Sequence, residues 1–501
     1  MAEGFTVTDA DDGSADDPAA KGRRNRREKL ALVLSDVDLW RGQDGAAYAS
    51  LPNGKRREHV PVFGRDFRVW IVQRYFAESG MGLSGTALSD VTRLAEARAL
   101  SGGESRVTFR RWALGNDGCI YLDLGGADPA RERRAVRIGP DRWDLIDEAP
   151  IAFLRAPDAL PLPEPMDDEA KVEDLRLFAN VETEDDLVLL WTWLVCAARP
   201  FEVRGAYPVL LIHGEQGSGK SGAARTLGEL IDPSALTGRA LPREERDFFV
   251  SAQNRHLVAF DNVSAVSDTF SDCLCRLATG GGFSARTLHS DADETTFALS
   301  RAVLVNGIPA LLGRADLADR AISIELKQIE TRRTEAELAC DMKRLRPGLL
   351  GLLCDGLSAA LRNLPTTHIA NPPRMADACH WAEAAAQGFA IDAGRVTTAW
   401  KANRTGADRA LLDGDDVAGA VVKLMTPPGA SFKGTPTQLF QRLVDLAGER
   451  VSSGKLWPRN PAGMGTKLRR LGPALRAAHT INVTHGRSGS EGERFWIISK
   501  G

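Results

Sequence analysis

The chain has 501 residues, enough for about three domains that each bury a core of their own. Apolar residues make up 43% and charged residues 26%, an ordinary balance for a soluble globular protein. No stretch approaches the roughly 18 consecutive apolar residues of a membrane span, and the N-terminus has no apolar signal core, so we expect a cytoplasmic protein without a membrane partner. Seven scattered cysteines without zinc spacing predict reduced, structural thiols.

The distribution of charge is more informative than its total. The net charge is only −3, but residues 431–501 hold 12 Lys and Arg against 4 Asp and Glu. A tail of +8 therefore follows a body of −11. Such a contrast indicates a polyanionic partner for the tail.

The N-terminal third gives few chemical signals. Residues 1–30 are expected to be a disordered tail, because clusters of Asp and Arg leave few apolar residues to bury. Residues 31–155 are predicted to be an α+β domain of unknown role, with helices near 67–78 and 89–100 and strands near 106–109, 119–122 and 135–138. Residues 156–205 are interpreted as a Pro-rich linker followed by a helix at 184–198.

A glycine-rich motif at 214–221 is the strongest signal in the chain, since it fits G-x-x-x-x-G-K-[ST] in full. An apolar run precedes it and a helix-forming run follows, as the motif requires. Glycines let backbone N–H groups approach phosphate, and the helix N-terminus adds partial positive charge. We predict an ATP-binding phosphate loop made of Gly214, Glu215, Gln216, Gly217, Ser218, Gly219, Lys220 and Ser221.

Two later strands end in residues suited to the same nucleotide. Lys220 would reach the β- and γ-phosphates, and Ser221 would ligate Mg²⁺. The apolar run 257–260 ends in Asp261, which we assign to Mg²⁺ directly or through water. The run 303–305 ends in Asn306, whose amide would bond the γ-phosphate or the attacking water. In this order, the motifs predict a sheet whose strand ends converge on ATP and Mg²⁺.

These residues carry a family resemblance. Lys220, Asp261 and Asn306 stand in the order and spacing of superfamily-three helicases, and the chain is most similar to the ATPase half of phage and mobile-element primase–helicases. The segments 278–288 and 306–309 resemble that family's "TGG…R.L" stretch and its Asn-x-x-Pro end of the sensor strand. The likeness covers about 208–326 and extends loosely to the whole chain, which looks like the ATP-binding proteins of bacterial mobile elements.

The resemblance implies an AAA+-like core over 206–326 that assembles as a ring, expected to be a hexamer, with nucleotide between subunits. Arg320 matches the position of the arginine finger that a neighbour supplies, and Arg314 is the reserve. An ion pair of Arg320 with Asp316 or Asp319 remains the structural alternative.

The family's pore hairpin falls before the sensor strand. Arg286 in this hairpin would contact single-stranded DNA, although pairing with the nearby acidic residues is the equal alternative. One position departs from the family, because Asn262 stands where many relatives carry a second acid. An amide cannot accept a proton as a carboxylate does, so either Glu215 or Asp268 takes that role or hydrolysis is slow.

The C-terminal part is predicted to hold two further domains. Residues 327–410 have helical spacing and are expected to form a lid on the core, with a capping box at Thr334 and a new helix opening at Pro347. Residues 425–501 resemble a winged helix, with helices after Thr435 and over 464–478 and strands at 480–484 and 494–498. Duplex DNA would be contacted by Lys467, Arg469, Arg470 and Arg487.

The sequence therefore predicts a multidomain α/β protein that acts as an ATP-dependent DNA translocase or helicase in the replication of a phage or mobile element. A separate primase is a candidate partner. Two rival hypotheses remain: a DNA-binding ATPase switch, such as an initiator, loader or regulator, that does not unwind DNA, and a small-molecule kinase with a phosphate loop.

Overall fold

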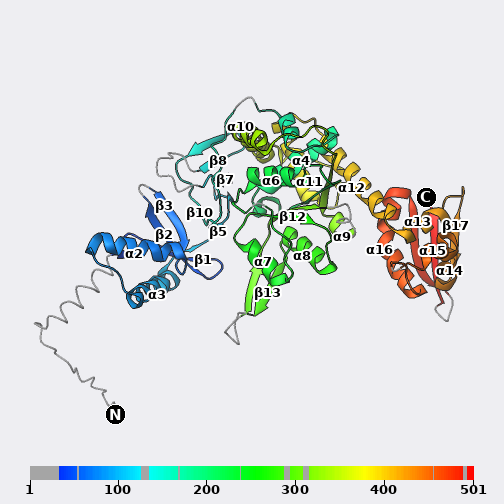
Figure 1. Ribbon diagram of the computed structural model, residues 1–501, viewed down its shortest axis with the longest axis horizontal. Coiled ribbons are helices and arrows are strands. Elements are labelled where there is room, and N and C mark those ends of the chain that lie inside the picture. The colour runs from blue at the N-terminus through cyan, green and yellow to red at the C-terminus, as the bar shows by residue number, and fades with distance from the viewer. Residues whose placement is uncertain are drawn as a thin grey trace, which may run out of the picture. The chain divides into compact units, whose positions relative to one another are not determined.

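The computed structural model describes residues 33–53, 56–125, 135–167, 170–236, 238–286, 294–307, 315–454, 456–488 and 493–501 (Figure 1). The chain divides into two compact units. The first comprises Met1–Phe109 and Pro150–Arg155, and the second comprises Arg110–Ala149 and Ala156–Gly501. The segment 31–155, expected as one domain, thus contributes to both units.

The first unit is a small sheet with two helices. Strands β1 (Asp38–Gly42), β2 (Ala47–Asn53), β3 (Arg56–Pro61) and β4 (Ser105–Arg106) form a sheet in the order β3-β2-β1-β4. Helices α2 (Arg65–Ser79) and α3 (Gly85–Gly102) bury Phe67, Ile71, Val91 and Ala95 in the same core as the sheet. A short parallel pair, β5 (Thr108–Phe109) with β10 (Ala152–Phe153), completes this unit.

The second unit begins with an antiparallel sheet of β6 (Trp112–Leu114), β7 (Ile120–Asp123), β8 (Ala135–Ile138) and β9 (Trp143–Ile146), in that order. Side-chain hydrogen bonds attach it to the rest of the unit. The Trp112 indole donates to the Ile231 carbonyl at 2.9 Å, and the Trp143 indole donates to Asp355 at 2.9 Å. The buried Arg111 forms an ion pair with Asp232 at 3.1 Å. Residues 110–149 therefore fold as part of the second unit.

A parallel sheet lies at the centre of the second unit. Its strands are β11 (Val209–Gly214), β12 (Leu257–Val263), β15 (Ala302–Gly307) and β16 (Ala321–Leu326), in the order β12-β15-β11-β16. Because side chains alternate along a strand, Leu210 and Ile212 pack with one set of helices, and Val209 and Leu211 with another. Both faces of the sheet are covered, as a parallel sheet requires.

The helices on the two faces are distinct. The core that contains Ile212 includes residues of α4 (Glu184–Ala198), α6 (Lys220–Ile231) and α10 (Glu335–Asn363). The core that contains Leu211 includes residues of α7 (Glu245–Gln253) and α8 (Asp268–Thr279). Figure 1 shows α6 on one side of β12 and α7 and α8 on the other. The sheet is thus the middle layer of three. A short 3-10 helix, η1 (Val172–Leu177), and α5 (Phe201–Arg204) flank α4 in the sequence.

The expected helical region after the sheet is present, with one correction. Thr334 caps α10 through a capping box with Glu337, as predicted. Pro347, however, does not open a new helix: α10 continues through it to Asn363. The proline removes one backbone hydrogen bond, but Leu349 and Leu353 are fully buried beyond it, and their packing keeps the helix intact. The region continues with α11 (Ala376–Ala385), η3 (Ala386–Phe389) and α12 (Arg395–Asp413).

The C-terminal part has the order helix, strand, helices, hairpin. It consists of α13 (Asp416–Leu424), β17 (Ser431–Gly434), α14 (Pro436–Ala447), α15 (Glu449–Ser452), α16 (Pro461–His479), β18 (Ile481–Ser488) and β19 (Glu493–Lys500). The strands form a sheet in the order β17-β19-β18 and share a core with α13, α14 and α16. The helices and hairpin predicted from the sequence are confirmed, whereas α13 and β17 were not predicted.

Two smaller findings complete the fold. Among the described residues, no helix is both long enough and apolar enough to cross a membrane. All seven cysteines are free thiols, and six of them are buried, which agrees with a structural role.

Candidate functional site

The glycine-rich loop joins β11 to α6 at the carboxyl edge of the parallel sheet. Gly214, Gly217 and Gly219 adopt φ values of +148°, +86° and +81°, which favour glycine. A Cβ on Gly214 would also lie 2.4 Å from the Leu326 carbonyl oxygen, so β16 leaves no room for a side chain there. Glycine at these positions therefore lets the loop pack against β16 and adopt the backbone conformation of a phosphate-binding turn.

Two polar side chains of this loop fit an anionic ligand. The ammonium of Lys220 donates to the carbonyls of Gly214 at 2.9 Å and Glu215 at 2.7 Å, so it lies folded over the loop. The hydroxyl of Ser218 is fully buried and has no hydrogen-bond partner among the described residues. The N-terminus of α6 also has no side-chain cap, because residue 219 is a glycine. A phosphate chain bound here could accept hydrogen bonds from these donors.

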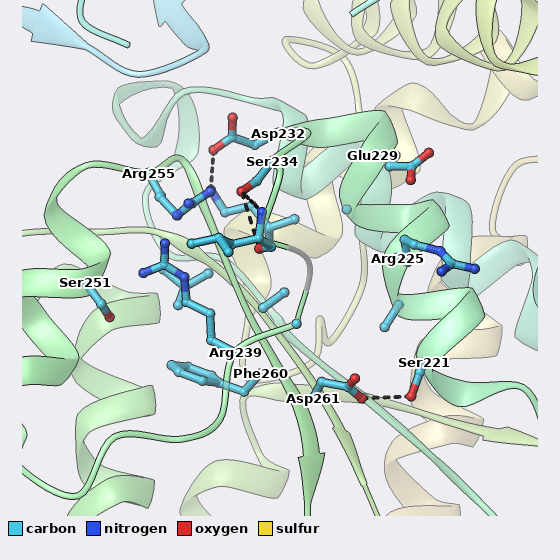
Figure 2. A pocket seen from close by; sticks show the side chains of 17 residues that line it. Ser221, Arg225, Glu229, Asp232, Ser234, Arg239, Ser251, Arg255, Phe260 and Asp261 are labelled. Carbon is cyan, nitrogen blue, oxygen red and sulfur yellow. Dashed lines mark hydrogen bonds between the residues drawn. The ribbon is translucent and has the colours of Figure 1, made fainter. Parts of the chain in front are cut away.

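The serine of the motif and the carboxylate at the end of β12 meet directly. Ser221 donates to Asp261 at 2.9 Å (Figure 2). The backbone of Asp261 is held by the segment at the sheet edge, where its N–H donates to the Arg239 carbonyl at 2.9 Å. Gly238 precedes that segment, and a Cβ there would lie 2.6 Å from the Cβ of Asp261. A hydroxyl and a carboxylate beside a phosphate loop are the hard oxygen ligands that Mg²⁺ prefers.

The order of the strands brings Asn306 to the same edge. Strand β15 lies between β11 and β12, and Asn306 is level with Ile212, two residues before the loop. The Asn306 side-chain oxygen accepts the backbone N–H of Asn262 at 2.7 Å, which fixes the orientation of the amide. Its Nδ2 atom is buried and has no partner among the described residues. The NH₂ group of Asn306 is thus left to donate to a ligand beside the loop.

Asn262 has an unusual backbone. Its φ of +55° lies in the left-handed region, at the irregularity between Phe260 and Val263 where the register of β12 shifts against β15. This kink aims its N–H at Asn306, so the residue has a positioning role that the sequence did not reveal. Its side chain is exposed.

A cavity of about 920 Å³ adjoins the loop on the side of α10. Leu177, Phe178, Ile329, Leu338 and Met342 give it an apolar part, and six basic side chains stand against two carboxylates in its lining. The glycine-rich motif and α6 form one wall of this cavity. Sequence motifs did not indicate the rest of it, which comes from η1 and its surroundings, from the segment after β16 and from α10. A second cavity, of about 120 Å³, lies behind α6; Ser221 and Asp261 are at one end of it and Arg255 is at the other (Figure 2).

The candidate arginine finger lies at the opposite edge of the sheet. The carbonyl of Arg320 accepts the N–H of Val209, the first residue of β11. A strand of this length spans roughly 20 Å, so Arg320 cannot reach the loop of its own chain. Its guanidinium donates to the backbone carbonyl of Asp316 at 2.9 Å. Asp319 instead pairs with Arg374 and Arg404, so the suggested ion pair with Asp319 is absent among the described residues. The reserve, Arg314, lies outside the described residues.

The expected hairpin before the sensor strand is present as β13 (Gly282–Arg286) and β14 (Glu294–Ala298), which pair antiparallel with Arg286 opposite Glu294. The tip of this hairpin lies outside the described residues. The structure gives the order of a hairpin followed by β15, as the family resemblance implied. The short connection 299–301 joins β14 of the hairpin to β15 of the central sheet.

The basic residues proposed for the tail differ in their surroundings. Arg469 and Arg470 are exposed on α16, and Arg487 is exposed on β18. Lys467 is turned inward, because its ammonium pairs with Asp415 at 3.0 Å and donates to the Leu456 carbonyl at 3.2 Å. Lys467 therefore ties α16 to α13, a contact that sequence spacing could not indicate.

Burial changes the protonation of two histidines near the sheet. Desolvation lowers the pKa of His213, which follows Ile212 in β11 and hydrogen-bonds Ser323 at 2.9 Å. Desolvation also lowers the pKa of His256, just before β12, to about 4, despite its hydrogen bond to the Ala197 carbonyl. Both side chains are therefore neutral at pH 7, and His213 adds no positive charge beside the loop.

Two family models match parts of the chain. Residues 171–413 match the family model of the actinomycete integrative conjugative element replication protein. Residues 417–501 match the model of the AICE RepA C-terminal domain. From η1 to its last residue, the chain is therefore similar to a replication protein of a mobile element. No curated protein matches it in sequence.

Solved structures resemble it at low identity. The apo C-terminal region of NrS-1 is 12% identical, with 94% of this chain and 98% of that chain covered and a TM-score of 0.40. The structure titled SCCmec type IV Cch, active helicase, is 12% identical, with 92% of each chain covered and a TM-score of 0.47.

Proposed function

We propose that the chain is an ATP-dependent DNA translocase or helicase that acts in the replication of a mobile element. One observation carries the nucleotide part of the proposal. Ser221, Asp261 and Asn306 come from α6, β12 and β15, and all lie at the edge of the sheet that carries the glycine-rich loop. Within the described part of the chain, the Nδ2 atom of Asn306 has no hydrogen-bond partner. The family match to a replication protein supports the connection to DNA.

The site's own residues have separate roles in this proposal. Backbone N–H groups of the loop and the ammonium of Lys220 bind the phosphate chain, and Ser218 donates its free hydroxyl. Ser221 and Asp261 hold Mg²⁺, which when bound neutralises charge on the phosphates. The Nδ2 atom of Asn306 positions the attacking water or the terminal phosphate. Water attacks the terminal phosphorus, the bond to the bridging oxygen breaks, and ADP and phosphate leave.

The mechanism also requires a group that accepts a proton from the attacking water. The Asn262 amide cannot accept the proton of the attacking water. Glu215, exposed in the loop, and Asp268, the first residue of α8, are the proposed alternatives. If neither serves, hydrolysis is slow and ATP binding dominates. This observation favours the second candidate function, a DNA-binding ATPase switch that does not unwind DNA.

The position of Arg320 supports an assembly. It lies roughly 20 Å from the loop of its own chain, so it can act on nucleotide only across a subunit boundary. A ring places the amino edge of one sheet next to the carboxyl edge of its neighbour, and a hexamer is the proposed form. The guanidinium would then stabilise charge that develops during phosphoryl transfer.

DNA contacts are proposed at two places. Duplex DNA would contact the winged-helix arrangement of α14, α16 and the β18–β19 hairpin, through Arg469, Arg470 and Arg487. The tail's charge of +8 supports a salt-sensitive contact to phosphates. Single-stranded DNA would pass the β13–β14 hairpin, with Arg286 as its contact. A separate primase remains a proposed partner.

A strand-displacement assay separates the two functions. The purified chain is incubated with a forked duplex, Mg²⁺ and ATP, and Lys220→Ala serves as the inactive control. Displacement that requires ATP and disappears in Lys220→Ala supports the helicase. ATP-dependent binding to the fork without displacement refutes unwinding and supports the switch.

A further inference from the structure

The segment that leaves β16 lies against the glycine-rich loop. The side-chain amide of Asn180 donates to the Lys327 carbonyl at 2.8 Å, which anchors the start of the segment. Ile329 then contacts the loop twice: its N–H lies 3.4 Å from the Gly217 carbonyl, and its side chain lies 2.9 Å from where a Cβ on Gly219 would be. We call residues 327–333 the strap. It ends at Thr334, the cap of α10.

Arg332 of the strap lies over the loop. Its Nη2 atom is 3.3 Å from the position that a Cβ on Gly217 would take. The side chain is exposed and lines the large cavity beside the loop. Arg332 makes no ion pair or hydrogen bond to any residue in the described part of the chain.

Two arginines close to Arg332 pair with carboxylates, whereas Arg332 pairs with none among the described residues. Arg225 pairs with Glu335 at 2.6 Å, and Arg333 pairs with Asp341. A guanidinium that stays unpaired beside other cations raises the local positive potential, and it gains most from an anion. The nearest place for such an anion is the turn of the loop at Gly217.

We propose that Arg332 binds the phosphate chain of the nucleotide held by the loop of its own subunit. This inference rests on the proposed nucleotide site and adds a phosphate contact that comes from the side of α10. Arg332 is joined to α10 through Thr334, so a phosphate bound by Arg332 would link the loop to the start of that helix. The substrate class is a nucleoside di- or triphosphate, because a monophosphate offers less charge at this position.

Equilibrium binding of ATP, ADP and AMP to the full chain with Mg²⁺ tests the inference. The variants are Arg332→Ala and Arg332→Lys, with Arg333→Ala as the matched control, because Arg333 is its neighbour and is already paired with Asp341. We expect Arg332→Ala to weaken ATP binding about 10- to 100-fold, a range typical of a lost charge-assisted hydrogen bond. The loss should be smaller for ADP and absent for AMP, and Arg332→Lys should recover part of it.

Two outcomes would overturn the inference. One is an ATP affinity of Arg332→Ala equal to that of Arg333→Ala. The other is an equal loss for all three nucleotides, which indicates a structural role. Failure of the nucleotide site itself gives a different result, because the unaltered chain and Lys220→Ala would then bind ATP equally weakly.

Discussion

Replacing Gly238 with alanine tests whether the sheet edge positions Asp261. Gly238 has a φ of +67°, and alanine there costs about 1–2 kcal/mol of folding free energy. The added Cβ would also lie 2.6 Å from the Cβ of Asp261 and 3.1 Å from its Oδ2 atom. The first distance is shorter than contact between carbon atoms allows, so Asp261 has to move. Its 2.9 Å hydrogen bond to Ser221 is then lost.

The matched control is Gly394→Ala. Gly394 lies in the same unit and is also left-handed, with a φ of +81°, but no atom lies within 4 Å of an added Cβ. Both variants should lose a similar free energy of unfolding in urea. Only Gly238→Ala should weaken Mg²⁺-dependent ATP binding, by about 10- to 150-fold, since a contact to a charged group contributes about 1.5–3 kcal/mol. The affinity of each variant for ATP is measured by calorimetric titration with and without Mg²⁺. Equal ATP affinities of the two variants would refute the role of Gly238 in positioning Asp261.

Three further predictions follow from buried polar groups. The pKa of His256 falls from 6.5 to about 4 on folding, so between these pH values the unfolded chain binds a proton that the folded chain does not. The free energy of unfolding is therefore highest above pH 6.5 and decreases by about 3 kcal/mol as the pH falls toward 4. His256→Gln should remove that pH dependence of urea unfolding. Arg111→Ala should cost about 3–5 kcal/mol in the same assay, because Asp232 is left charged and buried, and a loss below 1 kcal/mol would contradict this. Asn306→Asp keeps the acceptor for the Asn262 N–H but places a charge on a side chain that is 1% exposed, so it should melt at a lower temperature than the unaltered chain. At a temperature where the variant stays folded, its ATP hydrolysis should fall about 100-fold because a donor becomes a repelling oxygen. Unchanged turnover would remove Asn306 from the site.

The sequence was sufficient where local physics decides the structure. The glycine-rich motif lies between β11 and α6 as predicted, because glycine is needed at three positions of positive φ. The apolar runs before Asp261 and Asn306 are buried parallel strands, as short uninterrupted apolar runs indicate. Thr334 and Thr435 cap helices through reciprocal side-chain hydrogen bonds, which are local signals.

Long-range packing explains what sequence reasoning missed. Residues 110–149 were grouped with the N-terminal domain, yet the ion pair of Arg111 with Asp232 spans 121 positions in sequence. The DNA contact predicted for Lys467 stays a prediction, but its ion pair with Asp415, the cap of α13, was not foreseen. Arg332 had no motif at all, because its significance depends on the distance to Gly217. All three findings depend on contacts between residues far apart in the sequence, which neither periodicity nor motif spacing predicts.

The most direct test of the account is ATP hydrolysis by the purified chain, with and without single-stranded DNA, beside Lys220→Ala. The account predicts hydrolysis that rises when DNA is added and that disappears in Lys220→Ala. Tight ATP binding without hydrolysis on any DNA would contradict the motor, and it would identify the missing second acid at Asn262 as the reason.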